Sequence, residues 1–144
     1  LVVAAFLPPP YCLSLPAGLS TFLWFLVSMA LGFLAAVAFC MLVYITTFYT
    51  MSPIGIRIIA VTIVEFLSGG VVPIPFFPDS IRFIFELLPF ASMQNMPLRI
   101  YSGNINGNDV LAGIMLQVFW LAVMVCVGRL LMNRALKRVV IQGG

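Results

Sequence analysis

The sequence contains no histidine, and only 8% of its 144 residues are charged. An ordinary soluble domain has about 25% charged residues. The four acidic residues stand at least seven positions apart. An adjacent acid pair, a histidine-based triad and a metal site therefore lack the residues that they need. We predict that the chain is not an enzyme and has no catalytic residue, cofactor or metal.

Motifs for nucleotide binding are also absent. The sequence contains neither the phosphate-cradling GxxxxGK[ST] nor GxGxxG. If the chain takes part in powered transport, the energy must come from a partner. The three cysteines, Cys12, Cys40 and Cys126, lie far apart and suggest neither a metal site nor a disulfide framework.

What the sequence has in abundance is apolar residues, at 63%. No charged side chain occurs between Leu1 and Ile56, whereas about 20 apolar residues suffice to cross a bilayer. We therefore expect an all-α integral membrane protein with about three transmembrane helices. The expected segments, within one transmembrane domain, are spans over residues 19–49, 54–69 and 110–131, and a tail over 132–144.

The first residues, 1–7, are apolar and do not show the basic start of a secretory signal. We interpret them as the end of an earlier span, and a disordered apolar leader is the alternative. Prolines at 8–10 then mark a loop, because proline cannot continue a helix. Ser52 and Pro53 are expected to open the second span as its cap and first turn.

Residues 70–106 are expected to form a re-entrant or interfacial hairpin. Pro73, Pro75 and Pro78 exclude regular helix in an apolar stretch, and such backbone is tolerated at membrane depth only when it packs on protein or lines a cavity. A short amphipathic helix over 79–88 should follow. That helix is too short to span the bilayer.

Local signals within the hairpin predict its details. Asp79 or Ser80 should cap the short helix, and Arg82 and Glu86, four residues apart, should pair. Pro89 and Pro97 should break the next piece into short parts. A turn at Asn106 and Gly107 should precede the last helix, capped by Asn108 or Asp109.

The distribution of basic residues predicts the orientation. Four of the seven basic residues lie within ten positions near the C-terminus, with no acid among them: Arg129, Arg134, Lys137 and Arg138. By the positive-inside rule this end is cytoplasmic, and the hairpin lies on the outer side. The cluster therefore indicates topology and contact with anionic lipid, and not nucleic acid. Contact with a cytoplasmic partner is the alternative.

Four polar residues are candidates for a transport pathway: Glu65, Gln94, Asn95 and Gln117. Glu65 is the sharpest, because a charge inside a span usually faces a cavity or a partner. A structural hydrogen bond near the Gly69-Gly70 helix end is the alternative. Arg99 is expected to fix the hairpin by pairing with Glu86 or Asp109, and attraction of anionic lipid head groups is the alternative.

Residues 50–144 contain a series of short motifs in a particular order and spacing. They are Leu67-Ser68-Gly69, Pro73, Phe76-Phe77-Pro78, Leu88-Pro89-Phe90, Pro97, Arg99-Ile100, Gly103, Gln117, Trp120, Arg134 to Arg138 and Gln142-Gly143-Gly144. In this arrangement the chain resembles the C-terminal half of the ABC-2 type permeases, in their bacterial six-span branch. The N-terminal half that the family would add is not in this sequence.

The resemblance implies a permease subunit of an ABC exporter in the cell membrane. Its partners would be a cytoplasmic ATPase subunit, a second permease subunit, identical or a sister, and membrane lipid. A non-transporting scaffold or assembly subunit is the alternative. The hairpin would close the outer end of an alternating-access pathway. Its candidate gate residues are Gly69, Gly70, Pro73, Pro75, Pro78, Pro89, Pro97 and Arg99.

Overall fold

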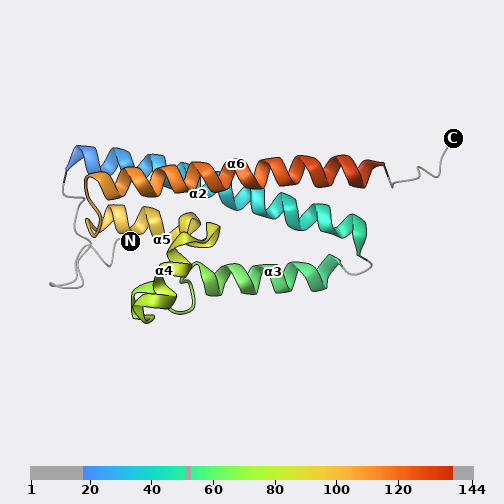
Figure 1. The fold of residues 1–144 in the computed structure, drawn as a ribbon, viewed down its shortest axis with the longest axis horizontal. Coiled ribbons are helices and arrows are strands. Elements are labelled where there is room, and N and C mark those ends of the chain that lie inside the picture. The colour runs from blue at the N-terminus through green and yellow to red at the C-terminus, as the bar shows by residue number, and fades with distance from the viewer. Residues whose placement is uncertain (1–17, 51–52, 138–144) are drawn as a thin grey trace, which may run out of the picture.

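The computed structural model describes residues 18–50 and 53–137, and every regular element in these ranges is a helix (Figure 1). This confirms the predicted all-α fold. The elements are α2 (Leu19–Thr46), the 3-10 turn η1 (Thr47–Tyr49), α3 (Pro53–Leu67), the 3-10 turn η2 (Ile74–Phe76), α4 (Asp79–Leu87), α5 (Pro89–Tyr101) and α6 (Asn108–Leu136). The expected earlier span, the proline loop, the Ser52 cap and the last tail residues lie outside the described ranges.

Among the described residues, two stretches are long and apolar enough to cross a membrane, namely Leu19–Tyr49 and Asn108–Leu136. The second has 29 residues, or about 44 Å at 1.5 Å per residue. This exceeds the roughly 30 Å of a hydrocarbon core. The remaining expected span, the second along the chain, is the 15-residue helix α3, which is only about 22 Å long.

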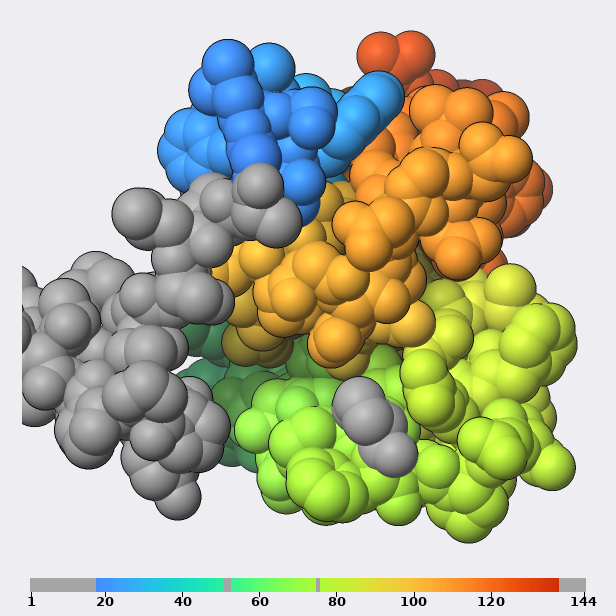
Figure 2. Space-filling view, turned by 90° about the vertical axis from the view of Figure 1, so that its left-hand side faces the viewer, coloured from blue at the N-terminus to red at the C-terminus, as the bar shows by residue number. Residues whose placement is uncertain are grey.

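The helices α2 and α6 lie side by side and run in the same direction, while α3 and α5 run the opposite way (Figure 1). Viewed end-on, α5 fills the centre of the molecule, between α2 and α6 on one side and the segment from the end of α3 through α4 on the other (Figure 2). The most extensive packing is that of α2 on α6 and on α5. The hairpin helix α5 is thus part of the helical core.

The charged residues of the described ranges, Glu65 apart, fall into two groups. Arg57 lies near the start of α3, and Arg129, Arg134 and Lys137 lie at the end of α6. These two helix ends share one end of the bundle, which we call the basic end (Figure 1). The other end, where α5 ends and α6 begins, we call the hairpin end. The helices there carry Asp79, Arg82 and Glu86 on α4, Arg99 on α5 and Asp109 on α6. A small apolar core at the hairpin end contains Ile100, Ile105, Val110 and Ile114. Most other large apolar side chains, such as Phe33 and Met115, are exposed, as expected for a surface that faces lipid.

Two predicted helix caps are wrong by one residue. The N-cap of α4 is Pro78, and neither Asp79 nor Ser80 caps it with a side chain. The N-cap of α6 is Gly107, at φ +60°, in place of Asn108 or Asp109. At the start of α4, the Pro78 carbonyl accepts hydrogen bonds from the amides of Ile81 and Arg82, both at 2.9 Å. The first turn of α4 therefore forms without a side-chain acceptor.

The predicted break at Pro97 is also wrong. Pro89 opens α5, but Pro97 lies inside the helix, which continues to Tyr101. Proline has no amide hydrogen to donate to the carbonyl of Met93, four residues earlier. The helix survives because Pro97 is buried and both α2 and α6 pack on α5. Tertiary packing therefore overrides the local preference.

Candidate functional site

A buried polar network joins α2, α5 and α6. Gln117 and Ser28 are both 0% exposed, and Ser92 is 3% exposed. The Ser28 hydroxyl donates to Gln117 Oε1 at 3.0 Å, and Gln117 Nε2 donates to the backbone carbonyls of Ser28 and Ser92 at 3.1 and 2.7 Å. The amide nitrogen thus donates twice and the amide oxygen accepts once, and all three hydrogen bonds run between helices. The predicted pathway residue Gln117 therefore lies within the helix packing.

Two of these helices, α2 and α5, meet at a close backbone contact. A Cβ atom on Gly32 would lie 2.6 Å from the carbonyl oxygen of Met93 and 3.3 Å from that of Ser92. Only glycine lets α2 approach α5 this closely. Gly113 on α6 also makes room for a neighbouring helix, because the end of the Met96 side chain of α5 lies where a Cβ atom on Gly113 would be.

An ionic cluster ties α4 to α5 at the hairpin end. Glu86 Oε1 accepts from Arg82 Nε at 2.9 Å and from Arg99 Nη1 at 2.8 Å. This confirms the predicted pairing of Arg82 with Glu86, and of Arg99 with Glu86 rather than Asp109. The hydrogen bond to the Glu86 carboxylate, together with its charge, raises the pKa of the Arg82 guanidinium above its ordinary value.

A second contact anchors α4 at its C-terminal end. The indole Nε1 of Trp120, on α6, donates to the backbone carbonyl of Leu87 at 2.8 Å. Leu87 is the last residue of α4, where the final carbonyls of a helix have no intrahelical donor. The short helix is thus held at its C-terminal end by a span and along its side by Arg99.

The end of α3 is a glycine cap. Gly69 has φ +85°, and its amide donates to the carbonyl of Phe66 at 3.4 Å while Gly70 donates to the carbonyl of Glu65 at 2.9 Å. This is the Schellman arrangement, in which glycine takes the left-handed position after a helix. The chain then turns sharply into the proline-rich segment.

The segment after this cap packs through aromatic rings. The rings of Phe66, Phe77 and Phe85 form a triangle with centroid distances of 5.0 to 6.1 Å. Phe77 directly precedes Pro78, and η2 lies just before it. The prolines at 73, 75 and 78 therefore lie in a turn that is held against α3 and α4.

The predicted pathway residues do not meet at one point. Gln94 accepts a hydrogen bond from Ser68 at 3.4 Å. Asn95 lines a small cavity of about 30 Å³ beside Glu86 and Arg99. Together with the buried Gln117 they lie at three separate places around α5. Their role in transport stays a prediction, as does the gate role of the glycines, prolines and Arg99.

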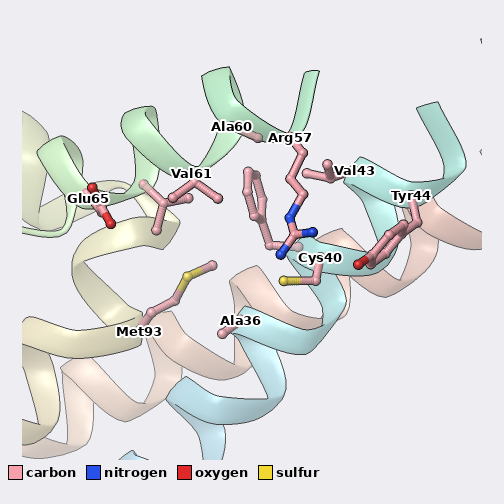
Figure 3. Close-up of a pocket in the computed structure, with 11 residues that line it drawn as sticks. Ala36, Cys40, Val43, Tyr44, Arg57, Ala60, Val61, Glu65 and Met93 are labelled. Carbon is pink, nitrogen blue, oxygen red and sulfur yellow. The ribbon is translucent and has the colours of Figure 1, made fainter. Parts of the chain in front are cut away.

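Glu65, the predicted pathway residue on α3, lies at a groove between helices. Its side chain is exposed, and it makes no ion pair within residues 53–137 or 18–50. It lines a groove of about 230 Å³ between α2 and α3, together with Arg57, Cys40 and Met93 (Figure 3). Its backbone carbonyl, in contrast, belongs to the glycine cap.

The sequence did not reveal that Ser28 and Ser92 bond to Gln117, or that Gly32 packs against the backbone of α5. The signal was present only in general form, because small residues scattered through an apolar span indicate close helix packing. Which of these small residues face α5 depends on a contact with a helix sixty positions later in the chain. Hydropathy alone does not contain that information.

Comparison with known protein families gives a match over nearly the full sequence. A family model described as "ABC-2 family transporter protein" matches residues 2–143, which is almost the whole chain. No curated protein and no solved structure matches.

Proposed function

The chain belongs to the ABC-2 family of transporter proteins, and on that premise we propose that it forms part of a permease subunit of an ATP-driven exporter in the cell membrane. The observation that carries the proposal is the family match over residues 2–143, on a chain whose two longest helices are apolar enough to cross a bilayer. Such a membrane protein provides the path, and a cytoplasmic ATPase subunit would provide the energy. A second permease subunit would complete the pathway.

The basic end would face the cytoplasm. In the described ranges Arg57, near the start of α3, and Arg129, Arg134 and Lys137, at the end of α6, have no acid among them, whereas the helices of the hairpin end carry charges of both signs. The positive-inside rule favours this orientation. α2 and α6 would then both run from outside to inside, and α3 would return as the third, shorter span.

In the alternating-access cycle that we propose, α2, α5 and α6 move as one body. The support is the network at Gln117 and the backbone contact at Gly32, both of which would have to break for α5 to move alone. The mobile part of the outer gate would be the segment from Gly69 through α4. It is joined to the body by the Glu86–Arg99 ion pair and by Trp120.

Labelling of single cysteines in the whole permease would test the topology. In a variant whose natural cysteines are replaced, Asn104→Cys at the hairpin end should react with a membrane-impermeant maleimide in intact cells. Lys137→Cys, the matched control at the basic end, should react only after the cells are permeabilised. Both residues are exposed. The opposite pattern would reverse the proposed orientation.

Purification and transport would test the function. A tag on this subunit should co-purify an ATPase with a nucleotide-binding motif. In vesicles containing that complex, ATP should change the labelling rate of Asn104→Cys, because the outer end opens and closes during the cycle. A complex without any ATPase would contradict the exporter proposal and would support a scaffold subunit.

A further inference from the structure

The groove between α2 and α3 combines an apolar wall with a charged mouth. Its volume is about 230 Å³, and its apolar lining includes Phe39, Val43, Val61, Val64 and Met93 (Figure 3). The Arg57 side chain extends from α3 into the groove toward α2. The Tyr44 side chain enters from α2 at the same end (Figure 3).

Among the described residues, no acid pairs with Arg57 in this groove. Arg57 makes no ion pair with any residue in the ranges 18–50 and 53–137. The acid on the same helix, Glu65, is eight residues further on, about 12 Å along the axis. A guanidinium stays protonated in proteins, and its attraction to an anion is stronger beside apolar walls than in water.

The position of Arg57 in the bilayer indicates which class of anion would bind to it. Arg57 lies in the second turn of α3, at the basic end, which we have placed on the cytoplasmic side. The lipids of a cytoplasmic leaflet include anionic ones, and basic pockets between spans on that side bind their head groups. Guanidinium groups match phosphate oxygens with two parallel hydrogen bonds.

We propose that this groove binds an anionic phospholipid, with its phosphate against Arg57 and the Tyr44 hydroxyl and one acyl chain along the apolar wall toward Met93. The groove is smaller than the roughly 300–1,000 Å³ of a closed ligand pocket. It therefore holds the head group and the upper part of one chain, and the rest of the lipid stays in the bilayer. A lipid so placed bridges α2 and α3, which contact each other far less than α2 contacts α6.

The proposal goes beyond export, because lipid binding is measured without ATP and without transport. The whole permease is placed in nanodiscs of phosphatidylcholine that contain a trace of photoactivatable phosphatidylglycerol or, in the matched sample, photoactivatable phosphatidylcholine. Both lipids carry the reactive group in the acyl chain. Peptides around Phe39 and Val61 are then analysed for attached lipid by mass spectrometry.

These peptides should carry about fivefold more phosphatidylglycerol than phosphatidylcholine, which corresponds to about 1 kcal/mol for one arginine near an anionic lipid. Arg57→Gln should bring the ratio to about one. Arg57→Lys should leave an intermediate ratio, because the charge remains and the paired hydrogen bonds are lost. Arg134→Gln, an exposed arginine at the same end but outside the groove, should leave the ratio unchanged.

Three results would overturn the proposal. The first is equal labelling of these peptides by the two lipids in the unmodified permease. The second is a preference for phosphatidylglycerol that survives Arg57→Gln. The third is labelling of other exposed helix surfaces but not of these peptides, which would mean that protein and not lipid fills the groove.

Discussion

The carbonyl oxygen of Met93 lies 2.6 Å from the position that a Cβ atom on Gly32 would occupy. Met93 is the residue whose helical hydrogen bond is removed by Pro97, which has no amide hydrogen. The Met93 carbonyl of α5, which lacks its usual intrahelical donor, thus faces Gly32 of α2, a residue without a side chain. A carbonyl facing a glycine Cα–H is a recurring contact between closely packed helices.

Gly32→Ala should therefore destabilise the protein. The added methyl group would meet backbone rather than a flexible side chain, and overpacking of this kind costs about 1–3 kcal/mol. The free energy of unfolding of the whole permease, measured in the same detergent for each variant, is the readout.

Gly128→Ala is the matched control, because a Cβ there would find Leu42 at an ordinary distance of 3.7 Å. It should change the free energy of unfolding little. Equal effects of the two substitutions would show that α2 and α5 do not approach as closely as the structure has them.

The contrast between Pro97 and the other prolines shows what the sequence could predict. The all-helical fold, the long helices and the Arg82–Glu86 pair follow from hydropathy and from four-residue spacing, which are local properties. The continuity of α5 through Pro97 is not local, since it depends on burial against α2 and α6. The same holds for Gln117, whose partners Ser28 and Ser92 come from two distant segments.

Gln117→Met should reduce stability while leaving transport per folded molecule unchanged. The thioether matches the amide in length but cannot bond to Ser28 and Ser92, and interhelical hydrogen bonds within membranes are worth about 0.6–1.7 kcal/mol. A thermal unfolding midpoint, with the rate of ATP-dependent efflux normalised to folded protein, separates the two effects. Met115→Leu, at an exposed site on the same helix, is the control.

A double-mutant cycle with Ser28→Ala sharpens this test. If the two side chains act through their mutual hydrogen bond, the losses in free energy should be less than additive. A normal stability together with a lost efflux rate would instead place Gln117 in the pathway, as the sequence alone suggested.

Glu86→Gln should loosen α4, because Glu86 is the shared acceptor of Arg82 and Arg99. The Arg99 pair is partly exposed, so its loss should cost no more than about 1 kcal/mol and raise hydrogen exchange in α4 by at most about fivefold. Asp79→Asn, at the start of the same helix and outside the cluster, should have a smaller effect. Equal exchange in all three proteins would remove the cluster as the tie between α4 and α5.

Glu65→Gln should impair export without lowering the amount of protein in the membrane. The residue has two roles. Its backbone carbonyl takes part in the glycine cap of α3, and the substitution leaves this hydrogen bond in place. Its carboxylate lines the groove, and the substitution removes the negative charge there. Thr62→Ala is the control, since Thr62 lies on the same helix and its hydroxyl bonds only within it, to the carbonyl of Ile58. ATP-dependent efflux from vesicles, together with the abundance of each variant in the membrane, provides the measurement. Unchanged efflux at normal abundance would remove the Glu65 carboxylate from the transport pathway and leave the residue with its backbone role at the glycine cap.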